Sequence, residues 1–114
     1  DTKEVDEYVA DPLCGFLFTV AGFMDLSQLT IQCNEDRWFK NVAQDMPVIL
    51  MSGDMDPVGN YGKGVKEVYQ KLLDTGHKNV TLKLYPEARH EILNEINKQE
   101  VYDDLDKWIE ENVL

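Results

Sequence analysis

Two short apolar segments in the second half of the chain limit its possible folds more than any other feature. Residues 48–51, Val-Ile-Leu-Met, form an unbroken apolar run, which is typical of a short strand buried on both faces. Residues 80–85 alternate apolar side chains with Thr, Lys and Tyr, which predicts a half-buried strand. A stretch with helical spacing lies between them and ends at Gly76. Strand, helix and strand in this order predict a parallel pair with a right-handed crossover, and therefore an α/β fold.

A second helix is expected after the second strand. Asn97 and Glu100 resemble the two ends of a capping box, with Asn in place of Ser or Thr. The expected core face of this helix carries Val101, Leu105, Trp108 and Ile109. Residues 46–114 are therefore predicted to form one strand–helix–strand–helix unit.

The first part of the chain, residues 1–45, is predicted to be helical. Apolar residues at steps of three and four predict one helix that begins near Leu13, and Asn34 is expected to cap a second, short helix. The aromatic and methionine residues of this part have two interpretations, a helical core or the lining of an apolar substrate channel. They are Phe16, Phe18, Phe23, Met24, Trp38 and Phe39.

Composition excludes several classes of function. The chain has 114 residues, fewer than the roughly 150 of an average domain, so one domain or part of one is expected. Its net charge of −11 argues against nucleic-acid binding and against attraction to anionic membranes. No run of 18 apolar residues is present, so no membrane span is expected. The acidic start lacks both an initiator Met and the apolar core of a signal peptide, which suggests that residue 1 is not a natural start.

The two cysteines, Cys14 and Cys33, have neither the spacing nor the histidine partners of a zinc site. They are interpreted as two buried thiols in a reducing compartment, and a cytoplasmic location is expected.

Two residues with catalytic potential follow the two predicted strands, at the ends where functional groups gather in open α/β sheets. Asp56 lies four residues after Ser52, and His90 lies five after Tyr85. A carboxylate beside an imidazole fixes its tautomer, which a general base for a serine nucleophile requires. Alone, Asp56 fits an ordinary turn before Pro57, and His90 fits a loop histidine with one hydrogen bond. Together, on neighbouring strand ends, the two favour an acid–base pair.

Other motifs are rejected. The zinc motif H-E-x-x-H fails because Asn94 stands in place of the second histidine. An EF-hand loop beginning at Asp54 fails because Val58 stands where an oxygen ligand is needed. His77, next to Gly76, is expected to be an exposed loop residue, and Asp103, Asp104 and Asp106 are expected to form a solvated helix face.

These loops resemble those of a known family. Residues 47–59 are similar to the seventh strand and acid loop of α/β-hydrolases, and residues 82–91 to the eighth strand and histidine loop. The nearest subgroup is the lysophospholipase or monoacylglycerol-lipase-like one, and residues 11–14 resemble the end of its helical cap. The resemblance implies that Asp56 is the triad acid, His90 the triad base and Asp54 a structural loop acid. No metal or organic cofactor is implied.

The chain also departs from this family. It contains no G-x-S-x-G motif, and its only serines are Ser27 and Ser52. Many relatives have a Gly in the turn before the histidine, where this chain has residues 87–89, Glu-Ala-Arg. The resemblance therefore implies the C-terminal part of a serine hydrolase, with residues 1–45 as a cap or lid remnant and residues 46–114 from the hydrolase domain.

Several functional expectations follow. The parent enzyme would cleave a carboxylic ester, or alternatively an amide, of a small, largely apolar acyl substrate. This chain alone, without the nucleophile, would be inactive. The edge of the first strand would pair with the missing N-terminal part or cause self-association. The alternative is a non-catalytic α/β module that binds a partner.

Overall fold

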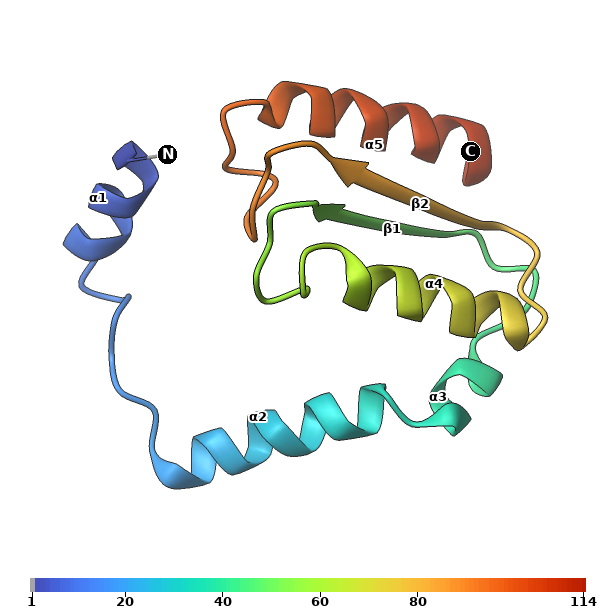
Figure 1. Ribbon diagram of the computed structural model, residues 1–114, viewed down its shortest axis with the longest axis horizontal. Coiled ribbons are helices and arrows are strands. Elements are labelled where there is room, and N and C mark those ends of the chain that lie inside the picture. The colour runs from blue at the N-terminus through green and yellow to red at the C-terminus, as the bar shows by residue number, and fades with distance from the viewer. Residues whose placement is uncertain (1) are drawn as a thin grey trace. The chain divides into compact units, whose positions relative to one another are not determined.

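The computed structural model describes residues 2–114, and the chain divides into two compact units, Asp1–Val42 and Ala43–Leu114 (Figure 1). The second unit contains both strands. β1 (Val48–Gly53) and β2 (Val80–Tyr85) pair in parallel, with Val48 opposite Val80 and Gly53 opposite Tyr85. Helix α4 (Lys63–Asp74) connects them. The predicted strand–helix–strand motif and its parallel pairing are confirmed.

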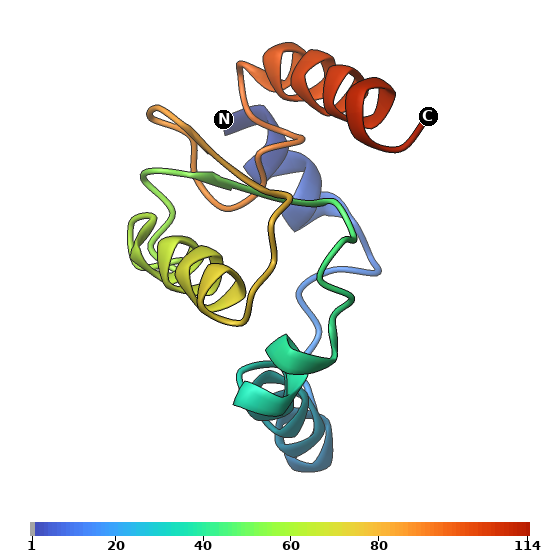
Figure 2. The ribbon, with the colours of Figure 1, turned by 90° about the vertical axis from the view of Figure 1, so that its right-hand side faces the viewer.

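The two helices of the second unit lie on opposite sides of the strand pair (Figures 1 and 2). Helix α4 lies on one side, and α5 (Lys98–Asn112) lies on the other. The apolar face of α5 packs Val101 against Tyr85 and Ala88, and all three side chains are buried. Met51 and Ile92 pack on this cluster. The core therefore joins β1, β2, α5 and the loop that follows β2.

A polar network also attaches α5 to β2. The buried Tyr85 hydroxyl donates to Asp104 Oδ2 over 3.0 Å, and Lys83 Nζ lies 2.6 Å from the same oxygen. The hydrogen bond from Lys83 lowers the pKa of the Asp104 carboxyl, whereas burial raises the pKa of the Tyr85 phenol. Asp104 is thus half-buried and paired, and the predicted solvated face is wrong at this residue because it turns toward Lys83.

Two local predictions in this unit are wrong. Asn97 precedes α5, but its side chain makes no capping hydrogen bond, since ψ is 21° instead of the extended value that an N-cap residue needs. His77 is 3% exposed, not a surface residue. Gly76 has φ of 96°, which turns the chain back so that His77 Nδ1 reaches the Leu72 carbonyl at 3.1 Å. His77 therefore closes the end of α4.

The first unit is helical, with different boundaries from those predicted. The helix expected from Leu13 begins only at residue 20, because Thr19 takes an extended backbone and its hydroxyl accepts from the Gly22 N–H over 3.1 Å. Asn34 ends this helix instead of starting the next one. The helices are α1 (Thr2–Ala10), α2 (Val20–Cys33) and α3 (Asp36–Asn41).

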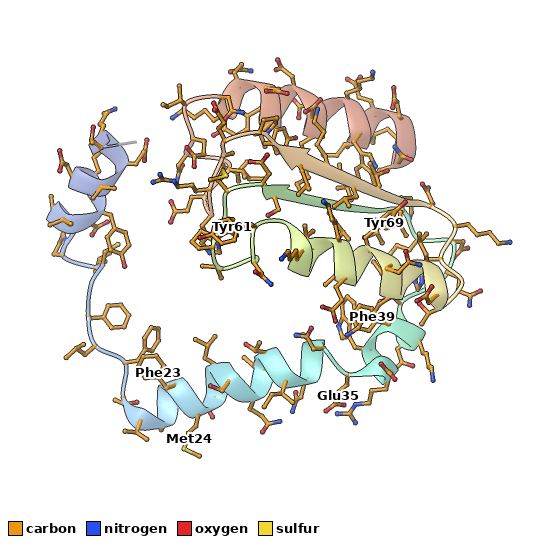
Figure 3. All side chains as sticks on the ribbon, in the orientation of Figure 1. Phe23, Met24, Glu35, Phe39, Tyr61 and Tyr69 are labelled. Carbon is orange, nitrogen blue, oxygen red and sulfur yellow. The ribbon has the colours of Figure 1, made fainter. Side chains whose placement is uncertain are left out.

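Most apolar side chains of this unit are exposed. Phe39 is 2% exposed, but the other five aromatic and methionine residues expected to form a helical core are exposed, so that interpretation is wrong for them. Figure 3 shows Phe23 and Met24 projecting from α2. Cys14 is half-buried and Cys33 exposed, and neither forms a disulfide, so the predicted pair of buried thiols is also wrong. No helix within residues 2–114 is long and apolar enough to cross a membrane.

Candidate active site

The candidate site lies on two loops that leave the same end of the strand pair. The acid loop, residues 54–62, follows β1, and the histidine loop, residues 86–97, follows β2. Because the strands are parallel and end in register at Gly53 and Tyr85, their two loops begin side by side. The sheet thus brings together two segments that are more than 30 residues apart in sequence, as the 34-residue separation of Asp56 and His90 illustrates.

Asp56 is buried and multiply bonded. Its Oδ1 accepts the backbone N–H of Val58 over 2.9 Å, which closes a short turn around the carboxylate. Its own carbonyl oxygen accepts the N–H of Tyr61 over 2.8 Å. Oδ2 lies 3.1 Å from His90 Nδ1. The structure therefore brings together the two residues that the sequence singled out.

Opposing effects act on the acidity of Asp56. Burial by itself raises the pKa of the carboxyl, because the charged form loses water. The hydrogen bond from His90, the N–H groups of Val58 and Gly59, and the charge of the imidazole lower it, and together they place the pKa below its ordinary value of 3.8. The carboxylate is therefore ionised at neutral pH and acts only as an acceptor.

His90 lies in a contrasting environment. Its side chain is 62% exposed, whereas that of Asp56 is 7% exposed. Since an ionised carboxylate can only accept, His90 Nδ1 carries the proton of the shared hydrogen bond. Nε2 is then the nitrogen with a lone pair in the neutral ring. An oriented imidazole with a basic Nε2 can remove a proton from a hydroxyl or water.

The two loops are in direct contact through their backbones. Met55 N–H donates to the Ala88 carbonyl over 3.0 Å, and Glu87 N–H donates to Asp54 Oδ1 over 2.8 Å. A Cβ added to Gly53 would lie 2.1 Å from the Ala88 carbonyl oxygen. Gly53 thus permits an approach that any other residue would block. This role of Gly53 was not predicted from the sequence, although a Gly at the end of a buried strand is a known sign of close backbone approach.

Both loops contain residues in the left-handed backbone region. Asn60 and Tyr61, near the end of the acid loop, have φ of 51° and 54°, and Tyr61 lies beside the start of α4 (Figure 3). In the histidine loop, Glu87 has φ of 61°. This is the turn in which the resemblance to α/β-hydrolases led us to expect a Gly. The turn therefore forms although this chain has Glu at position 87. Gly would adopt the same left-handed backbone conformation at a lower steric cost.

A carboxylate that sequence analysis did not single out also supports the histidine loop. Glu95 Oε1 accepts the N–H of Arg89 over 2.7 Å. Within the second unit, the Ser52 hydroxyl donates to the Gly53 carbonyl and makes no hydrogen bond to His90. No group of three or more His, Cys, Asp or Glu side chains in this described range is arranged to hold a metal ion.

Comparisons with known proteins bear on the family and the fold of the chain. A family model described as "Serine aminopeptidase, S33" matches residues 1–97. A curated relative, the monoglyceride lipase of Saccharomyces cerevisiae, is 34% identical over 105 residues, which cover 89% of this chain and 32% of the relative.

Two solved structures are similar to the model. A highly thermostable carboxyl esterase from Bacillus coagulans, solved in complex with glycerol, matches with a TM-score of 0.91 and 31% identity over 100% of this chain and 37% of its own. A lipase in an open form matches with a TM-score of 0.83 and 29% identity, over 96% of this chain and 36% of its own.

These relatives are hydrolases of the lipase and esterase type, and the chain spans about a third of their length. The family model covers well over half of the chain, and the likeness of fold extends over all of it. The resemblance found in the two loops is thereby confirmed. The chain belongs to the serine aminopeptidase S33 family of α/β-hydrolases.

Proposed function

We propose that this chain supplies the acid and the base of a Ser-His-Asp triad in a serine hydrolase that cleaves carboxylic esters. The observation that carries the proposal is the 3.1 Å contact between His90 Nδ1 and the buried, ionised Asp56. In this arrangement Asp56 holds the tautomer and orientation of the ring and stabilises the imidazolium as it forms.

The proton path in such an enzyme begins at the serine. His90 Nε2 removes the serine proton as the oxygen attacks the ester carbonyl, and the protonated ring then donates that proton to the departing alcohol. Water repeats the sequence on the acyl-enzyme, and the carboxylic acid is released. Asp56 stays ionised throughout, in keeping with its lowered pKa.

The nucleophile must come from sequence outside residues 1–114, because neither serine of this chain lies in a G-x-S-x-G motif. The 114-residue chain alone is therefore expected to be inactive, since an oriented imidazole without a nucleophile and an oxyanion hole forms no acyl-enzyme. Burst-phase ester cleavage by the isolated chain would contradict this.

The full-length protein is tested with a fluorophosphonate probe. Covalent labelling of a serine, lost in the His90→Ala variant, is expected for the enzyme. Labelling that survives in His90→Ala, or absence of labelling in the unmodified protein, would argue against a triad that contains His90. Lys107→Ala, on the exposed part of α5, serves as a control and should label normally.

The substrate class follows from the relatives. Two of them are named as a monoglyceride lipase and a carboxyl esterase. These names support a carboxylic ester as the substrate. We propose a small, largely apolar acyl substrate, of the kind cleaved by lysophospholipase-like and lipase-like relatives. The cap or lid identity of residues 1–45 is part of the same proposal, because residues that set substrate specificity usually belong to the cap. The cytoplasmic location stays a prediction.

The alternative function is a non-catalytic α/β module that binds a partner. One observation favours this alternative. Within residues 2–114 the sheet has two strands, so that β1 is paired with β2 along one of its two edges. Unpaired backbone groups at the other edge invite a further strand.

For the enzyme, we propose that this unpaired edge of β1 pairs with the remaining part of the protein, and that the isolated chain self-associates. Light scattering that finds a monodisperse monomer would contradict self-association.

A further inference from the structure

The backbone directly before His90 is held by a side chain from further along the same loop. Glu95 Oε1 accepts the N–H of Arg89 over 2.7 Å, a length typical of a strong, charge-assisted hydrogen bond. Glu95 is half-buried, in contrast to Glu91, which is exposed. The contact therefore fixes the Ala88–Arg89 peptide unit, one residue before His90.

The rest of the histidine loop is anchored before that point. Glu87 N–H donates to Asp54 over 2.8 Å, Ala88 N–H donates to the Tyr85 carbonyl over 3.4 Å, and the Ala88 side chain is buried. Glu95 thus supplies the last of three consecutive backbone anchors. Because the His90 ring is 62% exposed, little packing surrounds it, and its position depends on this backbone.

Glu95 is itself held by α5. Its carbonyl oxygen accepts the N–H of Lys98 over 3.0 Å at the first turn of the helix. Nearby, the Tyr102 hydroxyl of α5 donates to the Leu93 carbonyl over 2.8 Å. These bonds place the Glu95 carboxylate relative to a helix that the core fixes through Val101.

We infer that Glu95 is a positioning residue for His90: it holds the Arg89–His90 backbone so that Nδ1 meets Asp56. The catalytic consequence rests on the function proposed above, whereas the geometric consequence does not. Loss of the carboxylate frees the Arg89 N–H, and the ring then samples orientations in which the 3.1 Å contact is broken.

The experiment compares Glu95→Ala, Glu95→Gln and unmodified protein, all at full length. Gln keeps an acceptor oxygen at the same distance and removes the charge, whereas Ala removes both. Glu110→Ala, an exposed residue of α5, controls for loss of a negative charge. The first readout is the Nδ1–H signal of His90 in protein labelled with ¹⁵N-histidine, assigned by its absence in His90→Ala. The second is kcat and KM for a short-chain ester.

Glu95→Ala should weaken or broaden the His90 Nδ1–H signal and lower kcat on the order of tenfold to a hundredfold, with KM within about twofold. Glu95→Gln should keep the signal and most of kcat. An unchanged signal and kcat in Glu95→Ala would overturn the inference, and so would equal losses in Ala and Gln, which would indicate a charge effect. Should the Ala variant not fold, Glu95→Asp, one methylene shorter, is expected to show the same loss of signal.

The two readouts separate failure of this inference from failure of the proposed function. Absence of ester hydrolysis in the unmodified protein would refute the function, while the His90 signal would still report whether Glu95 holds the ring. Normal hydrolysis with an unchanged signal in Glu95→Ala would refute only the positioning role.

Discussion

The acid loop and the histidine loop leave the same end of the sheet but are built differently. Asp56 is buried, and its carboxylate and carbonyl are engaged by the backbone of its own turn. His90 is largely exposed, and the backbone before it is held by Asp54 and Glu95, which lie outside the turn. Local structure therefore holds the acid in place, whereas the backbone before the base is held by a side chain of the acid loop and by Glu95 further along its own loop.

The largest effect is expected from Asp56→Asn in the full-length enzyme. An amide donates a hydrogen bond to Nδ1, which favours the wrong tautomer and removes the charge that stabilises the imidazolium. We expect kcat/KM for ester hydrolysis to fall by about 10³–10⁴-fold. The exposed Asp106→Asn of α5 is the matched control and should retain full activity. A loss below tenfold in Asp56→Asn would mean that Asp56 does not orient the base.

The next effect tests the contact between the two loops. Gly53→Ala places a Cβ within 2.1 Å of the Ala88 carbonyl oxygen, so the loops must separate. We expect a loss of about 3 kcal/mol in the free energy of unfolding, measured with urea, together with a loss of activity.

Gly64→Ala at the start of α4 is the control for this substitution. Its Cβ would lie 3.2 Å from the Gly59 carbonyl oxygen, and Ala favours a helix, so a change within about 1 kcal/mol is expected. Equal effects at the two positions would show that the approach of the loops at Gly53 has no special importance.

Acid stability should also distinguish the loops. The pKa of Asp56 is lower in the folded chain than its ordinary value of 3.8, so the carboxylate stabilises the fold above that value. This stabilisation is lost as the pH falls through the lowered pKa. Between pH 5 and about pH 2, the unfolding free energy of Asp56→Asn should therefore decrease less steeply than that of the unmodified protein. Parallel curves would contradict the assignment.

The smallest effect concerns the strained turn before the base. Glu87 has φ of 61°, which glycine adopts without a steric cost, and the contact with Asp54 uses the backbone N–H. Glu87→Gly should therefore keep the loop conformation and increase the free energy of unfolding by about 0.5 kcal/mol. A slightly higher melting temperature would show this gain. Glu87→Val, which is β-branched, should be destabilising. A destabilised Gly variant would show that the Glu side chain supports the turn.

The strands and the proximity of Asp56 to His90 could be predicted because their signals are periodic or topological. Residues 48–51 and 80–85 differ clearly from a helix, and parallel strands must bring their following loops together, which places Asp56 beside His90. The prediction failed where a few torsion angles decide the outcome. The extended backbone of Thr19 places the start of α2 at residue 20, and the left-handed backbone of Gly76 brings His77 against the end of α4. No periodic pattern marks such positions.

The supports of the histidine loop were not predictable for a different reason. Glu95 reaches Arg89 across an irregular segment, and the approach of Gly53 to Ala88 depends on the exact path of both loops. The exposed apolar residues of the first unit, among them Phe23 and Met24 of α2, show the opposite error, in which an apolar stripe indicated a core that these residues do not form. Hydrophobic spacing predicts which face is apolar, but it does not identify what covers that face.

The most direct test of the account is the rate of short-chain ester hydrolysis by the full-length protein and by its His90→Ala variant. The account predicts measurable hydrolysis that falls by at least about 10³-fold when the imidazole is removed. Equal rates for the two proteins, or no hydrolysis by the unmodified one, would contradict the assignment of His90 and Asp56 as the base and acid of an esterase.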